Sequence, residues 1–218
     1  MKILDVPRSG SYQAITSSRN RFGQYIRTRA TPVNPATAAQ GLVRARLSAN
    51  AAAWRALTAI QQAGWASLGD SMTRTDSLGQ QYTLTGANAY SSVNNLNVAA
   101  GNAVVSDAPS LVTPSALLTA TITLTAAAFS VAYTATPLPA GTRLMTFVSP
   151  QRSAGRRFEG DFRLLAVSAA AAASPANIFA AYQAKFGTPI VGNRIFLSLV
   201  VYAAGFQSGP LVTSAVVA

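Results

Sequence analysis

Apolar residues between residues 34 and 68 recur at spacings of three and four. A stripe of this period is typical of an amphipathic helix. Asn34 followed by Pro35 is a favourable helix start, because asparagine caps free N–H groups and proline at the first position has no N–H to satisfy. We therefore expect a helical unit that begins at Asn34, with a stripe formed by Val43, Leu47, Ala51, Trp54, Leu57, Gln61, Trp65 and Leu68.

Two features refine this helical unit. Thr58 stands three residues before Gln61, which is the spacing of a capping box, so we expect two helices that meet near Leu57. Trp54 and Trp65 are eleven residues apart and share a face even if the helix is continuous. We expect both tryptophans to be packing anchors, because tryptophan stabilises a core or an interface mainly through the large area that its side chain buries.

A further helix is predicted after a polar segment in which residues 82–85 form a short strand. Thr85 is a favourable N-cap and Gly101 a favourable C-terminal stop. The apolar side of this helix matches the tryptophan face in length, so we expect the two to pack as an antiparallel helical hairpin. The residues on that side are Ala89, Tyr90, Val93, Leu96, Asn97 and Ala100.

Beyond residues 107–115, a Pro- and Ser-rich segment typical of a linker, the hydrophobic period changes from 3.6 to two. The strand-like runs are 118–125, 128–136, 142–149, 161–168, 193–203 and 209–218. Short strands at this spacing predict an antiparallel β-sandwich of immunoglobulin or fibronectin type. One helix interrupts it. We expect that helix to start with Ser174 as cap and Pro175 in first position, to present Ile178, Phe179, Tyr182 and Phe186, and to end at Gly187.

The segment before the first helix is basic and contains one acid, Asp5. Within it, residues 12–16 and 24–30 alternate apolar and polar side chains and enclose a turn-like sequence, which predicts a hairpin or two extended strands. The expected fold class is therefore α+β. Its expected parts are an extended basic arm over residues 1–33, a small helical unit over 34–106 and a β-sandwich with one inserted helix over 107–218.

The charge is one-sided: the formal net charge is +11, although only 11% of the residues are charged. Such an excess indicates either an acidic partner, which could be DNA or an acidic protein lattice, or a surface adapted to low pH or high salt. The candidate contact residues of the arm are Arg19, Arg21, Phe22, Tyr25, Arg27 and Arg29. A second candidate is the loop 149–161 with Arg152, Arg156 and Arg157. This loop lacks the strand, lysine and helix of a phosphate-binding loop, and we expect it either to be solvated or to make interface contacts.

The residue types that most catalytic chemistry needs are missing. The chain contains no cysteine and no histidine, which excludes thiolate and imidazole chemistry and nearly every zinc, haem or copper site. The one close carboxylate pair, Glu159 and Asp161, is expected on one side of a strand in an exposed ion-pair cluster with Arg156 and Arg157. We therefore expect no enzymatic activity, no cofactor and no metal. With no long apolar run and no signal-peptide pattern, we expect a soluble, non-secreted chain that does not bind membranes.

The arm and the first helices carry three specific motifs. They are N-R-F-G-Q-Y-x-R-x-R at residues 20–29, N-P-x-T-A-A-Q at 34–40 and W-x-x-L-T-x-x-Q-x-x-x-W at 54–65. With these motifs, residues 10–105 resemble a family of uncharacterised tailed-phage and prophage proteins thought to be virion components. The predicted C-terminal module is loosely similar to the immunoglobulin-like modules of phage heads and tails. The resemblance implies a structural role in the particle and no catalytic residues.

The leading expectation is a phage decoration or cement protein, made in the host cytoplasm and located in the virion in many symmetric copies. Its expected partners are other virion proteins, above all the major capsid protein, and copies of itself. An alternative is a nucleic-acid-binding module in which the arm arginines contact phosphates while Tyr12, Phe22 and Tyr25 stack on bases. A neck or tail connector, with the sandwich as an adhesion domain, is a further alternative.

Overall fold

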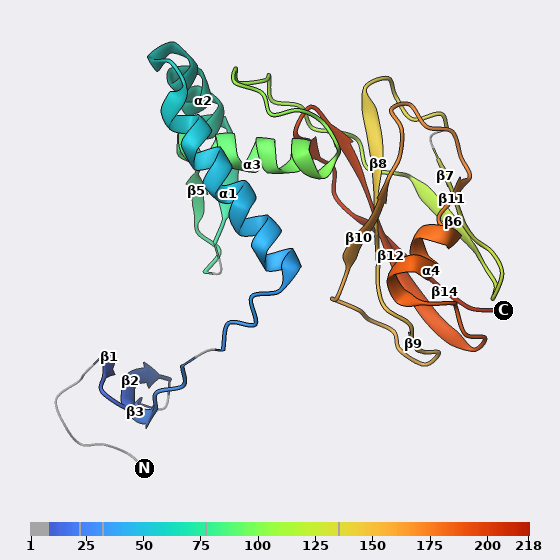
Figure 1. The fold of residues 1–218 in the computed structure, drawn as a ribbon, viewed down its shortest axis with the longest axis horizontal. Coiled ribbons are helices and arrows are strands. Elements are labelled where there is room, and N and C mark those ends of the chain that lie inside the picture. The colour runs from blue at the N-terminus through green and yellow to red at the C-terminus, as the bar shows by residue number, and fades with distance from the viewer. Residues whose placement is uncertain (1–8, 22, 32, 77, 135) are drawn as a thin grey trace. The chain divides into compact units, whose positions relative to one another are not determined.

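The structure is a computed structural model that describes residues 9–21, 23–31, 33–76, 78–134 and 136–218. Figure 1 shows a mixed fold of helices and antiparallel strands, so the expected α+β class is confirmed. The chain divides into two compact units, residues 1–43 and residues 44–218.

The first unit contains a small antiparallel sheet in the order β1-β2-β3. Its strands are β1 (Gly10–Tyr12), β2 (Ile15–Asn20) and β3 (Gly23–Thr28). The predicted hairpin is confirmed, with a tighter turn than expected, because Asn20 pairs with Gly23. None of the described side chains in these strands is buried. In its described residues, the arm sheet, as we call residues 10–28, therefore has no hydrophobic core of its own.

Helix α1 (Ala38–Ala56) starts later than its Asn34-Pro35 signal predicts. A capping box sets the true start: Gln40 N donates to Thr37 Oγ1 (3.3 Å), and Thr37 N donates to Gln40 Oε1 (3.2 Å). The Asn34 side chain instead accepts from Ala36 N (3.3 Å) in a turn outside the helix. The expected N-cap was wrong because reciprocal capping satisfies two backbone donors, whereas a lone asparagine satisfies one.

The other helix boundaries in this part of the chain follow the sequence signals. The predicted break is confirmed: helix α2 (Ala59–Ser71) begins with a complete Thr58–Gln61 capping box. Helix α3 (Gly86–Ala99) has Thr85 as its N-cap, as expected. It ends in a Schellman motif, in which Gly101 N donates to Val98 O and Asn102 N donates to Asn97 O. Between α2 and α3, strands β4 (Thr73–Thr75) and β5 (Gln81–Thr83) form an exposed hairpin.

The helices share an aromatic core. The Tyr90 ring lies 5.1 Å from that of Trp65 and 5.7 Å from that of Trp54, measured between centroids. Tyr90 and Trp65 are buried, and Trp54 is half-buried beside them. The expected packing of α3 on the tryptophan face is thus confirmed. Phe206, which lies far along the chain in a strand, also belongs to this cluster.

All six predicted strand runs form strands, and three short strands join them. The larger sheet has the order β10-β8-β12-β13, with β14 and β9 also paired to β12, and the smaller one has the order β11-β7-β6. The bounds are β6 (Thr119–Leu124), β7 (Phe129–Thr134), β8 (Thr142–Val148), β9 (Arg152–Ser153), β10 (Arg163–Val167), β11 (Ala176–Asn177), β12 (Asn193–Ala203), β13 (Phe206–Gln207) and β14 (Leu211–Val216).

Strand β12 is the centre of the second unit because both of its faces are buried. Its odd-numbered residues Ile195 to Val201 enter a core with residues of the smaller sheet such as Phe129 and Val131. On its other face, Val200 and Tyr202 pack with Ala100 at the end of α3. Burial on both faces explains why β12 is a nearly continuous hydrophobic run rather than an alternating one.

Polar contacts also join the helices to β12. The Tyr202 hydroxyl donates to Asn97 Oδ1 (2.6 Å) and accepts from Asn102 Nδ2 (2.9 Å). The turn between β12 and β13 lies against α3, because a Cβ at Gly205 would be 2.4 Å from Val93 Cγ1. The sequence-based boundary at residue 107 therefore separates two segments that pack together.

Helix α4 (Phe179–Phe186) is shorter at its start than predicted. The Ser174 hydroxyl accepts from Tyr133 N (2.9 Å), and residues 176–177 form β11, which pairs with β7. The expected start at Ser174 was wrong because these residues extend the smaller sheet instead. The expected stop at Gly187 is confirmed, with a positive φ of 85° at that glycine.

Candidate functional site

The two faces of the arm sheet have different chemistry. Opposed residues of an antiparallel pair lie on the same face. Tyr12 opposes Ile15, and Ser17 opposes Ile26, so Tyr12, Ile15 and Ile26 share one face. Their side chains are 72%, 42% and 43% exposed. One small sheet therefore presents three large apolar side chains that are each at least two fifths exposed.

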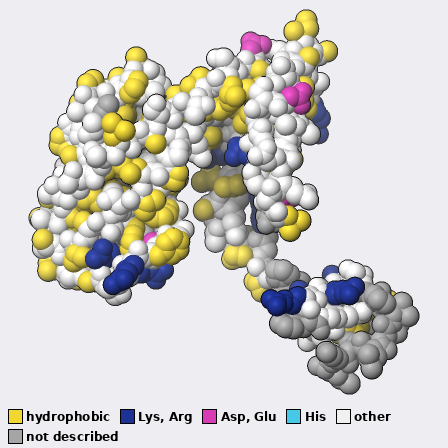
Figure 2. Space-filling model, turned by 180° about the vertical axis from the view of Figure 1, so that it is seen from behind, with side chains coloured by type: hydrophobic (Ala, Val, Ile, Leu, Met, Phe, Trp, Pro, Cys, Tyr) yellow, Lys and Arg dark blue, Asp and Glu magenta, His cyan; other side chains and the backbone are white. Residues whose placement is uncertain are grey.

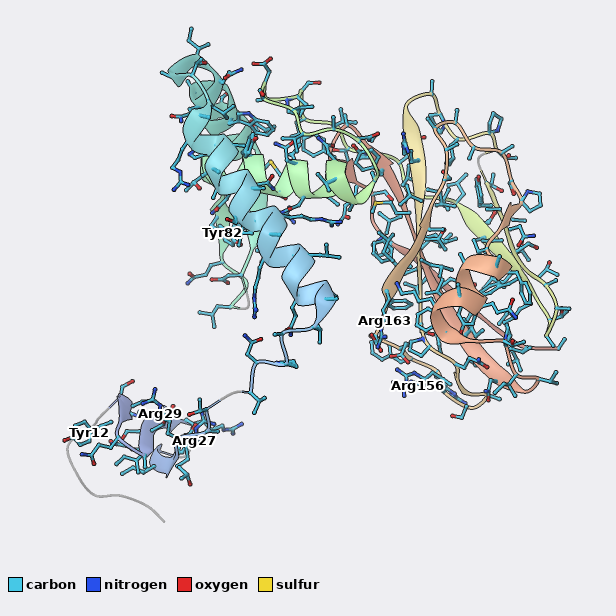
Figure 3. All side chains as sticks on the ribbon, viewed as in Figure 1. Tyr12, Arg27, Arg29, Tyr82, Arg156 and Arg163 are labelled. Atoms are coloured by element: carbon cyan, nitrogen blue, oxygen red, sulfur yellow. The ribbon has the colours of Figure 1, made fainter. Side chains whose placement is uncertain are left out.

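The opposite face of the arm sheet is basic. Arg27 opposes Thr16, and Tyr25 opposes Ser18, which places Tyr25 and Arg27 together on this second face. Arg29 N donates to Ala14 O (2.7 Å), so the pairing continues past β3 and the alternation places Arg29 on the same face as Arg27. Figure 3 shows the side chains of Tyr12, Arg27 and Arg29 projecting outward from this sheet.

The predicted contact residues of the arm are only partly brought together. Tyr25, Arg27 and Arg29 form one group, whereas Arg19 lies on the apolar face and Arg21 in the turn. Phe22 lies outside the described residues. The sequence prediction missed Ile15, although its position in the period-two pattern of residues 12–16 is the signal that could have identified it.

The charge of the first unit is almost entirely positive. Asp5 is the one acidic residue of the sequence over 1–43, and it lies outside the described residues. The described arm therefore presents arginine side chains with no carboxylate from the described part of the same unit. Figure 2 shows dark blue side chains on the visible face of this body. An acidic partner complements this surface.

The arginine loop, residues 152–163, has a different organisation. Glu159 is buried, and its Oε2 forms an ion pair with Arg152 Nε and a second with Arg156 Nε (3.3 Å). Its Oε1 accepts from the backbone N–H groups of Gly160 and Asp161, each at 2.9 Å. The expectation of an exposed cluster on a strand was wrong, because Glu159 lies in a loop and its carboxylate is enclosed by four donors. In Figure 3, Arg156 and Arg163 lie at this same end of the larger sheet.

This ring of donors stabilises the ionised carboxylate. Hydrogen bonds from Asp161 N and the Arg152 side chain lower the pKa of Glu159 from 4.5 to about 2. Two of the three predicted loop contacts, Arg152 and Arg156, are thus engaged within the loop, whereas Arg157 is exposed. Arg157 borders a groove of about 580 Å³ with Phe158, which is 79% exposed.

The ionised carboxylate of Glu159 makes the stability of the folded protein depend on pH. Because the folded pKa of Glu159 is lower than its ordinary value, the carboxylate contributes stability that is fully present above about pH 4.5 and is lost as pH falls toward about 2. We expect Glu159→Gln to lower the melting temperature at neutral pH and to flatten its dependence on pH in this window. Thermal melts from neutral to acidic pH check this, with Asp70→Asn, an exposed carboxylate, as control. An unchanged pH profile would contradict it.

The predicted packing anchors lie in the interior, not at a site. Trp65 is buried and its Nε1 donates to Ser106 O (2.7 Å), and Trp54 is half-buried against Tyr90. Sequence reasoning missed a polar network at the same place. Asn94 accepts from Val105 N (2.9 Å) and from Asn97 Nδ2 (3.3 Å), which fixes the segment that follows α3.

Two further observations limit the kinds of site present. Among residues 9–218 without the four masked positions, no group of three or more acidic, histidine or cysteine side chains could hold a metal ion. In that same part of the chain, no helix has both the length and the apolar character that crossing a membrane requires.

The candidate site is the arm sheet, which has Tyr12, Ile15 and Ile26 with Arg19 on one face and Tyr25, Arg27 and Arg29 on the other. Comparisons of the chain with protein-family models, curated proteins and solved structures found no match.

Proposed function

We propose that this protein is a non-enzymatic structural protein of a tailed-phage particle, a decoration or cement protein that binds the capsid lattice through its arm and helical unit. The observation that carries the proposal is the arm sheet, which exposes Tyr12, Ile15 and Ile26 and has no buried side chain among its described residues. A small sheet whose described side chains are all at least partly exposed gains little stability from its own packing, so a partner surface that covers it would add buried apolar area. The motif resemblance over residues 10–105 supports a virion partner.

The proposed partners are the major capsid protein and further copies of this chain. Repeated, shape-matched contacts of an apolar face, together with the basic side chains of the opposite face, suit a surface that presents the same acidic patch many times. The proposed location is the virion. A particle reconstruction tests the proposal directly: density for residues 44–218 at regular lattice positions supports it, and particles without such density contradict it.

The packing of the two sheets supports a more specific assignment of the fold of β6 to β14. Residues of β7 and β12 meet in one core, with strands of both sheets antiparallel to their neighbours. We propose that β6 to β14 form an immunoglobulin-like sandwich of the kind that occurs as an accessory module on phage particles. Strand order in an experimental structure checks this assignment.

One observation favours the nucleic-acid alternative. Tyr25, Arg27 and Arg29 share a face, which combines a stacking ring with phosphate-binding groups. This alternative gives Tyr12 a stacking role but leaves Ile15 and Ile26 on the same face without one, since phosphates do not cover isoleucine. The neck or tail connector is an alternative that differs only in location and is decided by the same reconstruction.

Salt dependence separates the lattice and nucleic-acid alternatives. Four arginines engaged on duplex phosphates would lose roughly a factor of 10² in affinity between about 50 and 200 mM salt. We expect weak DNA binding without sequence preference that is released by about 200 mM salt, and retention on emptied particles under the same conditions. Fluorescence anisotropy with a labelled duplex and co-sedimentation with particles measure the two. Tight DNA binding at about 300 mM salt without particle retention would favour the alternative.

A further inference from the structure

The outer edge of β3 is open. Strand β3 ends the sheet order β1-β2-β3, so its second edge has no neighbouring strand among the described residues. The other edge strand, β1, has only three residues, whereas β3 has six. A six-residue edge strand of this kind is a template for another extended chain.

The register shows which backbone groups of β3 point outward. Arg29 N donates to Ala14 O across the sheet, and alternate residues of an antiparallel strand direct their backbone groups to opposite sides. Arg27 and Tyr25 therefore bond toward β2. Gln24, Ile26 and Thr28 direct their N–H and C=O groups away from it. An added strand can pair with these three residues.

The two faces specify the side chains of that added strand. On one face, Ile26 would neighbour apolar residues of the partner, next to Ile15 and Tyr12. On the other face, Arg27 and Tyr25 would neighbour acidic ones. Because side chains of a strand alternate between faces, the matching partner alternates acidic and apolar residues.

We propose that β3 binds an extended polypeptide segment of the lattice protein by strand addition, and that this segment alternates acidic and β-branched apolar residues. This inference rests on the proposed function and specifies its binding mode. Two features favour a protein strand over a nucleic acid: the outward peptide groups of β3 and the exposed apolar face. The charge of the opposite face suits both partners.

A second copy of β3 is the less suitable occupant. Pairing β3 with itself would bring Arg27 and Arg29 of two copies into one sheet with no carboxylate from the described part of either arm. Like charges in neighbouring strands are destabilising. Charge complementarity therefore assigns the edge to an acidic segment.

The test uses the full chain and the synthetic peptide Glu-Val-Glu-Val-Glu-Val. Controls are the block isomer Glu-Glu-Glu-Val-Val-Val, the Lys-Val alternating peptide and a single-stranded oligonucleotide of equal charge. We expect the alternating acidic peptide to bind most tightly, measured by fluorescence anisotropy at about 150 mM salt, a physiological ionic strength. Equal binding of the block isomer would overturn strand addition, and preference for the oligonucleotide would favour the nucleic-acid alternative.

Substitutions at the edge give a matched pair. Ile26→Pro removes an outward N–H and is expected to weaken peptide binding roughly tenfold or more. The added strand would lose one backbone hydrogen bond to β3 and would clash with the proline ring. Ile26→Thr keeps the N–H and a β-branched side chain and should lose much less. Amide exchange at Arg29 N, the donor to Ala14 O, reports whether the hairpin remains folded in both variants.

A charge reversal tests the same edge without altering the backbone. Arg27→Glu should weaken binding of the Glu-Val peptide and strengthen binding of the Lys-Val peptide. If the unmodified chain binds emptied particles while the proline, threonine and glutamate variants bind them equally well, strand addition is wrong and the lattice function stands. If the unmodified chain does not bind particles at all, the proposed function is wrong, and strand addition to the lattice with it.

Discussion

Removal of residues 1–30 is expected to abolish binding to particles and to leave the melting temperature of the remaining protein unchanged. The deleted segment contains the whole arm sheet, from which no described side chain is buried. The capping box of Thr37 and Gln40 remains, so α1 keeps its start. Affinity should therefore be lost without loss of stability.

Co-sedimentation with emptied particles and thermal melts measure the two quantities on the same preparation. A variant with Arg19, Arg27 and Arg29 changed to glutamine is the matched control, because it retains the sheet and removes charge alone. We expect this control to bind weakly and to become less sensitive to salt. A large fall in the melting temperature of the truncated protein would show instead that the arm belongs to the fold of the second unit.

Gly205→Ala is expected to destabilise the second unit by about 2–5 kcal/mol. Gly205 has a φ of 87°, a region in which a side chain costs about 1–2 kcal/mol. An added Cβ would also meet Val93 Cγ1 at 2.4 Å and Asn97 Oδ1 at 3.1 Å. Overpacking of a well-packed contact costs about 1–3 kcal/mol.

Denaturant unfolding checks this value, with Gly209→Ala as control, because a Cβ there meets no atom within 4 Å. Limited proteolysis adds a second readout. The period change near residue 107 predicts a protected fragment that begins near Pro109. The packing of Phe206 on the Trp65 cluster predicts that this fragment appears from the Gly205→Ala variant more readily than from the unmodified protein. Equal stability of the two glycine variants would contradict the proposed role of this turn.

Local signals predicted local structure well. The capping box at Thr58 and the N-cap at Thr85 act between residues three apart, so the sequence contains the complete interaction. The start of α1 was mispredicted although Thr37 and Gln40 have the same spacing, because the Asn34-Pro35 pair was weighed alone. The start of α4 required knowledge of β11, whose partner strand lies more than 40 residues earlier.

The candidate surfaces were predicted in composition but not in arrangement. The arginines of the arm were identified, but their division between two faces depends on the register in which Asn20 pairs with Gly23. Glu159 was expected at the surface because glutamate is rarely buried without partners. Four donors from one loop converge on it, and the sequence spacing of Arg152, Arg156 and Asp161 does not specify that convergence.

The position of Phe206 determines when the aromatic cluster around Trp65 can be completed during synthesis. The helices α1 to α3 are complete at Ala99, but the aromatic cluster around Trp65 gains Phe206 only about 100 residues later. At translation rates of about 5–20 residues per second, roughly 5–20 s pass between the synthesis of Ala99 and that of Phe206. The strands of the arm sheet pair only with one another, and a hairpin can form in microseconds once its residues are synthesised. Under the proposed function, a chain that ends before Phe206 would therefore have an arm that can order on the lattice surface, but it would lack a complete helical core.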